Sequence, residues 1–332
     1  MTETLFALLL LALLSLACWG AGRALLDVCR VRSWQGGLEQ AIFAIALGMG
    51  TLAYFVLATG LLGGLRPIFL FYFMGVPFAL LGARHVGRVL GAAWAATRAG
   101  RKPRVALPPL WMTLSGTALV LLGLCTLVGA LAPPAGLEWD ALSYHLAGPK
   151  TYLHEGRIFY IPYDHHTNFP FTLQMLYTLM LSAGSVGGAK LCHWLCGALL
   201  VASVYTFAVR HVAATPERGR AIGLIAALIV ASTPIVLWEA SVAYVDLATA
   251  LFTWLSVYAL FNAASGLTPR PPSLIRSFVA GKGVPGTERQ AENPLSPKSQ
   301  QVPGTPFPAT KERIREGGWG VRPAQELSLI HI

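Results

Sequence analysis

The sequence predicts an all-α protein that crosses a membrane several times, and two observations lead to that fold class. Hydrophobic residues make up 55% of the 332 residues and charged residues only 12%, with a mean hydropathy of +0.57. In a soluble protein, about a quarter of the residues are normally charged. The apolar runs also reach the ~20 residues that a helix needs to cross a bilayer. These runs are too long and too uninterrupted for a soluble core.

The apolar runs predict seven transmembrane helices. They cover residues 4–23, 38–62, 67–83, 110–132, 185–209, 221–238 and 246–262. The third run contains Pro77, which predicts a kinked helix. No basic residue precedes the first run, which favours a true span over a signal peptide.

The basic residues predict the orientation of the spans, because Lys and Arg concentrate in cytoplasmic loops. They cluster after the first, third and fifth spans, at Arg23, Arg30, Arg32, Arg84, Arg88, Arg98, Arg101, Lys102, Arg104, Arg210, Arg218 and Arg220. The loop after the fourth span and the turn at 239–245 then share the outer face. We expect an integral protein of a bacterial-type cytoplasmic membrane. The net charge of +10 follows from this topology, and the absence of interleaved aromatics argues against a nucleic-acid partner.

The chain divides into three predicted parts. Residues 1–109 are an N-terminal addition of three spans with a basic loop, and residues 110–263 are a core of four spans. Residues 264–332 hold ten of the 22 prolines and show neither helical nor strand periodicity, so they cannot bury enough apolar surface to fold. They are either a disordered cytoplasmic tail or a non-native extension, and the second reading is favoured.

Two of the five cysteines, Cys192 and Cys196, lie four residues apart on one face of a predicted helix, with His193 between them. The sequence has no second pair of ligands at zinc spacing. Thiols packed among helices are therefore favoured over a metal site.

The loop between the fourth and fifth spans has about fifty residues, which is too long for a simple connection. Residues 141–155 predict an amphipathic helix that lies along the membrane interface and bends at Pro149. Residues 169–183 are apolar but too few to cross, which predicts a re-entrant or surface-lying segment. The titratable residues of the loop are Glu138, Asp140, His145, Lys150, His154, Glu155, Asp164, His165 and His166.

Two acidic segments on the predicted outer face are the candidates for chemistry. Asp140 directly follows a span and Trp139, where a carboxylate is able to accept a proton from a hydroxyl nucleophile. Glu239 and Asp246 bracket the turn between the last two spans. His165 and His166 are candidates for binding a metal or a phosphate, but consecutive histidines are a weak signal. For any one of these residues, simple solvation at the membrane surface is the alternative.

One series of residues runs through the outer loop in a distinctive order: Asp140, Tyr144-His145-Leu146, Lys150, Gly156-Arg157 and Asn168-Phe169-Pro170. This series resembles the first outer loop of GT-C-fold glycosyltransferases, in the branch related to protein mannosyltransferases and aminoarabinose transferases. The segment Tyr244-Val245-Asp246 after Pro234 is similar to their second outer acidic motif. The resemblance covers about residues 110–262. The chain departs from the family with His165-His166-Thr167, where relatives place a Glu before the Pro.

The resemblance implies roles for individual residues. Asp140 would be the catalytic base, assisted by Glu239 and Asp246 at the sugar or at a metal. Tyr144, His145, Lys150 and Asn168 would bind the substrate, with Lys150 at the donor phosphate. His165 and His166 would hold a divalent metal, Mg²⁺ or Mn²⁺, if the reaction uses one. The later spans and the soluble outer domain of the family do not appear, so the chain is expected to be the N-terminal part of such an enzyme.

The sequence therefore predicts a membrane glycosyltransferase. It would transfer a sugar from a polyprenyl-phosphate carrier to a lipid, glycan or protein acceptor outside the cytoplasm, by direct displacement. A transporter or flippase-like protein for a lipid or anion is the rival reading, although no inverted repeat is evident. A non-catalytic membrane subunit is the third.

Overall fold

The computed structural model describes residues 2–31, 36–66, 70, 75–98, 108–212 and 215–267. Every regular element within these ranges is helical, which confirms the predicted all-α class. Residues Met1–Pro285 form one compact unit. The predicted tail beyond residue 267 and the basic residues Arg32, Arg101, Lys102 and Arg104 lie outside the described residues.

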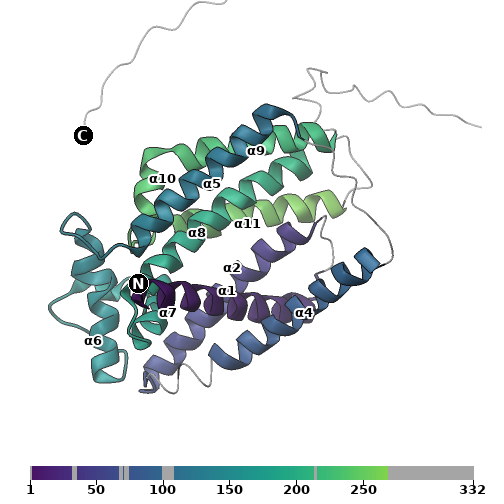
Figure 1. Cartoon of the computed structure of the whole chain (residues 1–332). Coiled ribbons are helices and arrows are strands. Elements are labelled where there is room, and N and C mark those ends of the chain that lie inside the picture. The colour runs from purple at the N-terminus through teal and green to yellow at the C-terminus, as the bar shows by residue number, and fades with distance from the viewer. Residues whose placement is uncertain are drawn as a thin grey trace, which may run out of the picture. The chain divides into compact units, whose positions relative to one another are not determined.

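Long helices make up most of the described chain (Figure 1). Among them, five are long and apolar enough to cross a membrane, so the protein is an integral membrane protein. These five are α1 (Thr2–Val28), α2 (Gly37–Leu61), α5 (Leu110–Leu131), α8 (Val186–Phe207) with its continuation η4 (Ala208–Val212), and α11 (Asp246–Leu267).

The third predicted span, 67–83, lies partly outside the described residues. Its second half belongs to α4 (Val76–Arg98), which continues fifteen residues beyond the predicted end and carries three arginines. The kink expected at Pro77 stays a prediction. The sixth predicted span is divided into α9 (Pro216–Ser232) and α10 (Pro234–Glu239). Pro234 cannot donate to the preceding turn, which ends α9 early.

Glycines allow the N-terminal helices to pack closely. A Cβ at Gly22 would overlap the carbonyl of Ala44, and a Cβ at Gly48 would overlap the carbonyl of Cys18. Such close backbone approach is typical of helix pairs in membranes, where small residues replace the hydrophobic driving force. Helix α1 also packs against α4 and α8. Residues 1–109 and 110–263 therefore share one core.

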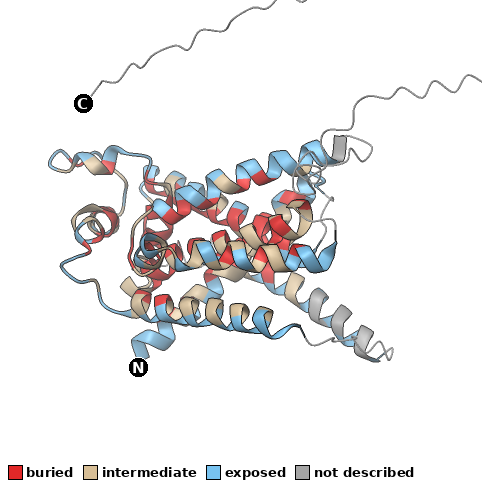
Figure 2. Cartoon of the chain, turned by 90° about the horizontal axis from the view of Figure 1, so that it is seen from above, coloured by how far each residue is buried: buried red, intermediate tan, exposed pale blue. Residues whose placement is uncertain are grey.

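Buried residues lie in the interior of the helical bundle, and exposed residues lie along its outer helices (Figure 2). On α5, Leu114, Val120, Leu121, Leu124 and Val128 are all exposed. An outward apolar face of this kind suits contact with lipid, because water would not stabilise it. Cys18, Cys192 and Cys196 are free and buried, as predicted for thiols packed among helices.

The two ends of the helical bundle carry charged residues of opposite sign. We call the end of the bundle where α5 stops and α8 starts the acidic end, because Asp140, Glu239 and Asp246 all lie there. The opposite end, with Arg210, is the basic end. About 30 Å separate Lys190 from Arg210 along α8 at 1.5 Å per residue, which matches the thickness of the hydrocarbon core.

A polar network closes the basic end. Arg210 on η4 pairs with the buried carboxylate of Glu39 on α2. Asn262 on α11 donates to the same Glu39 oxygen at 2.9 Å, and its own side-chain oxygen lies 2.8 Å from His211 Nε2. This network links three helices that are far apart in the sequence.

Among the described residues, five short helices lie at the acidic end, and all but one of them belong to the loop between α5 and α8. The first three are η2 (Ala141–His145), α6 (Ala147–Glu155) and η3 (His165–Asn168). The predicted helix over 141–155 is present but divided at Leu146, three residues before Pro149. The fourth is α10. The fifth is α7 (Thr172–Ser182), whose eleven residues reach only about 16 Å, so it does not cross the bilayer. Residues 173–180 are all buried, which corrects the expectation of a surface-lying segment.

Candidate functional site

Three carboxyl groups from two separate segments influence one another at the acidic end. Burial, followed by the nearby carboxylates of Asp246 and Asp140, raises the pKa of Glu239 to about 7. The structure thus brings together the two acidic segments that the sequence analysis singled out, although about a hundred residues separate them.

Two residues of η2 lie against these carboxylates. Burial, followed by the charge of the neighbouring Asp140 carboxylate, raises the pKa of Tyr144 to about 12. His145 is 4% exposed, and burial lowers its pKa to about 4 despite the neighbouring Asp140 and Asp246 carboxylates. His145 is therefore neutral at pH 7 and does not supply a positive charge for a phosphate.

A stack of rings extends from Tyr144 toward the solvent. The ring of His166 lies parallel to that of Tyr144, with centroids 4.3 Å apart and an interplanar angle of 7°. The His165 ring follows, 3.9 Å from His166. Asp164 orients His166, because its Oδ1 lies 3.0 Å from His166 Nδ1. The structure thus connects the His165-His166 pair to the carboxylates through Tyr144.

Two predicted substrate-binding residues are not drawn into this cluster. Lys150 is exposed on α6, and Asn168 is exposed at the end of η3. Within the described ranges, no group of three or more His, Cys, Asp or Glu side chains is arranged to hold a metal ion. The metal role of His165 and His166 stays a prediction.

Helix α7 braces both acidic segments. Gln174 Nε2 lies 2.7 Å from His145 Nδ1, and the Tyr177 hydroxyl donates to the carbonyl oxygen of Tyr244. The sequence analysis missed both residues, because a polar side chain in a short apolar run carries no sign of its distant partner.

Helix α8 holds the same two segments from the other side. Lys190 Nζ donates to Glu138 Oε1 and to the Ala132 carbonyl, both at 2.9 Å. His193 Nδ1 donates to the Val242 carbonyl at 3.0 Å, and its Nε2 accepts from the Leu247 N–H at 3.0 Å. Lys190 was also missed, although a lone lysine inside an apolar span is a recognised sign of function.

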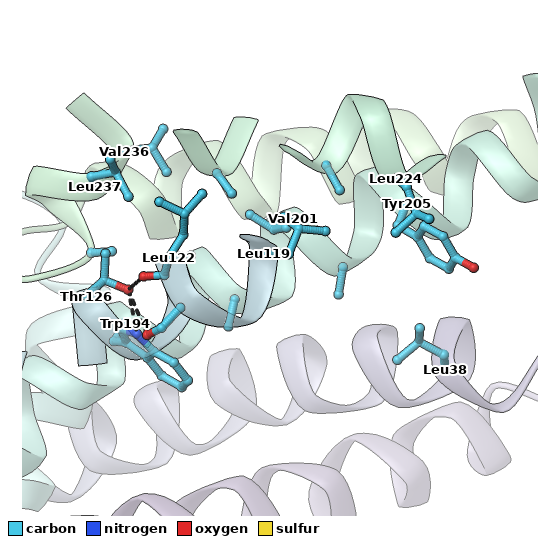
Figure 3. Close-up of a pocket in the computed structure, with 17 residues that line it drawn as sticks. Leu38, Leu119, Leu122, Thr126, Trp194, Val201, Tyr205, Leu224, Val236 and Leu237 are labelled. Atoms are coloured by element: carbon cyan, nitrogen blue, oxygen red, sulfur yellow. Dashed lines mark hydrogen bonds between the residues drawn. The ribbon is translucent and has the colours of Figure 1, made fainter. Parts of the chain in front are cut away.

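A largely apolar groove of about 360 Å³ runs beside the site, among α5, α8, α9 and α10 (Figure 3). It extends from Leu38 and Tyr205 toward the basic end to Val236 and Ala240 next to Glu239. Trp194 borders it with its indole N–H donating to Thr126 at 3.1 Å. The groove is suited to an elongated apolar molecule. Val236 and Ala240 line it beside Glu239, although the three carboxylates are not among its lining residues.

The site combines proton acceptors with a neutral imidazole and a groove within the helical bundle. A carboxyl group whose pKa lies near 7, with two further carboxylates beside it, is an arrangement suited to acid–base chemistry at neutral pH. No protein-family model matches this chain, and no curated protein or solved structure matches it either.

Proposed function

We propose that this protein is a membrane glycosyltransferase that uses a polyprenyl-phosphate sugar as its donor. The observation that carries the proposal is the convergence of Asp140, Glu239 and Asp246 from two segments at one end of a membrane bundle. A donor of this kind has its lipid in the bilayer and its sugar phosphate at the surface. Its reacting carbon therefore lies at the depth where spans end, which is where the carboxylates lie.

In the proposed reaction, the isoprenoid chain lies in the groove beside Trp194, and the sugar phosphate lies next to Glu239 and Asp246. Asp140 removes the proton from an acceptor hydroxyl or amine as that atom attacks the anomeric carbon. The bond between the anomeric carbon and the phosphate oxygen breaks, and polyprenyl phosphate leaves. The acceptor is a lipid, glycan or protein.

The neighbours of Asp140 support its role as the base. Tyr144 neighbours the Asp140 carboxylate and keeps its own proton, because its pKa is about 12. It orients the carboxylate without neutralising it. Glu239, with a pKa of about 7, supplies a proton to the phosphate or to a sugar hydroxyl, while Asp246 orients the sugar.

The proposed orientation has the acidic end outside the cytoplasm, in a bacterial-type inner membrane. It follows from Arg210, Arg218 and Arg220 at or beyond the opposite end of α8, since Lys and Arg concentrate on the cytoplasmic side.

Asp140→Asn tests the proposal. The substitution keeps the size of the side chain but removes the proton acceptor, so sugar transfer should fall by ~10²–10⁴-fold while donor binding is retained. Turnover would be measured in nanodiscs with a polyprenyl-phosphate sugar, with and without a chelator, beside Asp246→Asn and His166→Ala. Asp246→Asn should be less severe. Turnover near the wild-type rate in Asp140→Asn would exclude Asp140 as the base and favour a transporter or a non-catalytic subunit.

A further inference from the structure

Lys190 and His193 lie three residues apart in the first turns of α8, which places them on one face of the helix. The hydrogen bonds of the Lys190 side chain go to the segment before Asp140, at Ala132 and Glu138. Those of the His193 side chain go to the turn that carries Glu239 and Asp246, at Val242 and Leu247. One stretch of a rigid helix therefore holds both acidic segments.

The Lys190 contact is a buried ion pair. Lys190 is 1% exposed and Glu138 is 6% exposed, and the Glu138 oxygen bonded to Lys190 also accepts from the Ala135 N–H at 3.3 Å. The ammonium group thus joins two points of the segment between α5 and Asp140. Removing one partner of such a pair leaves an uncompensated charge and is strongly disruptive.

The His193 contact has a defined tautomer. Because Nε2 accepts the Leu247 N–H, the ring proton lies on Nδ1, where it is donated to the Val242 carbonyl. Leu247 lies in the first turn of α11, one residue after Asp246. The His193 side chain therefore caps the start of α11 and fixes the position of the backbone at Asp246.

We propose that Lys190 and His193 are positioning residues that set the separation between Asp140 and Asp246. Neither side chain is needed to touch the substrate. This inference rests on the proposed function, because the separation matters for sugar transfer only if the carboxylates carry it out. It adds two residues that hold the base and the sugar-orienting carboxylate at a productive distance.

Hydrogen exchange in nanodiscs tests the two contacts without any need for activity. In Lys190→Met, the backbone amides of residues 133–146 should exchange faster, while those of 240–247 keep the wild-type rate. In His193→Phe the pattern should reverse. If the two variants loosen the same segments, or loosen neither, the positioning role is wrong, whether or not the protein transfers sugar.

Turnover gives the second readout. Lys190→Met should lower kcat by about 100-fold, because a misplacement of about 1 Å costs that much even from outside the reacting groups. KM for the polyprenyl-phosphate sugar should stay near the wild-type value. Lys190→Arg keeps the pair with Glu138 and should recover most of the loss.

Arg210→Met is the matched control, since it breaks the other buried ion pair at the basic end. It should lower the unfolding temperature as Lys190→Met does but leave kcat unchanged. An equal loss of kcat in Arg210→Met would show that the effect is one of stability, and would overturn the inference. If the wild-type protein transfers no sugar, the proposed function fails. The hydrogen-exchange pattern then shows by itself whether Lys190 and His193 hold the two segments.

Discussion

Gln174 Nε2 lies 2.7 Å from His145 Nδ1, and this contact joins a helix that does not cross the membrane to the segment that carries Asp140. Three residues further along the same helix, Tyr177 bonds the turn that precedes Asp246. Helix α7 is therefore a brace between the two acidic segments. Its apolar composition reflects burial within the protein and not contact with lipid.

Tyr177→Phe should destabilise the protein by about 0.5–1.5 kcal/mol, because the carbonyl of the half-buried Tyr244 loses its hydrogen-bond donor. The ring itself stays in place, so packing is conserved. Unfolding by denaturant in detergent micelles measures the loss. Unchanged stability would indicate that Tyr244 finds another donor and that the brace does not depend on this bond.

Glu239 should make stability depend on pH in an unusual direction. Its pKa is raised from 4.5 in the unfolded chain to about 7 in the folded protein. The folded state thus binds more protons in that interval, and the stabilisation from Glu239 is complete below pH 4.5 and is lost as the pH rises to about 7. Above that window its contribution is constant.

Glu239→Gln checks this dependence, because glutamine resembles the protonated form at every pH. The unfolding temperature of the wild-type protein should fall relative to that of the variant as the pH rises from about 5 to about 7. Parallel curves for the two proteins would mean that Glu239 titrates near its ordinary value and that the carboxyl cluster does not form.

Gly48→Ala should weaken the pairing of α1 with α2, since the added Cβ would overlap the carbonyl of Cys18. Gly50→Ala is the matched control, because nothing lies within 4 Å of a Cβ at that position. Relative to the wild-type protein, Gly48→Ala should lower the unfolding temperature. Gly50→Ala should raise it slightly, because alanine favours a helix by about 1 kcal/mol over glycine. Similar unfolding temperatures for the two variants would contradict the close helix contact.

The proposed orientation can be tested by labelling introduced cysteines with a membrane-impermeant maleimide. Leu137→Cys, 81% exposed at the acidic end, should react in intact cells. Arg218→Cys, exposed at the basic end, should react only after permeabilisation. The background would lack Cys29 and Cys125, the two exposed native cysteines, and would keep the three buried ones. The opposite pattern of labelling would reverse the orientation.

Local sequence features were sufficient for the fold class and for the candidate acids. Apolar runs of bilayer length predict transmembrane helices without any knowledge of their neighbours. Asp140, Glu239 and Asp246 stand at the ends of such runs, so a shared face followed from counting the spans. The same local reasoning placed the end of the third span at residue 83, whereas α4 continues to Arg98.

The tertiary structure alone decided what holds those acids in place. Lys190 meets Glu138 across 52 residues and His193 meets Leu247 across 54, and no periodicity in the sequence records such pairs. The sequence also does not predict the burial of α7, because an apolar helix has the same composition whether lipid or protein covers it. Composition determines which segments leave water, since that preference belongs to each side chain. The partner of a buried polar group depends on which helices pack together, and only the folded chain decides that.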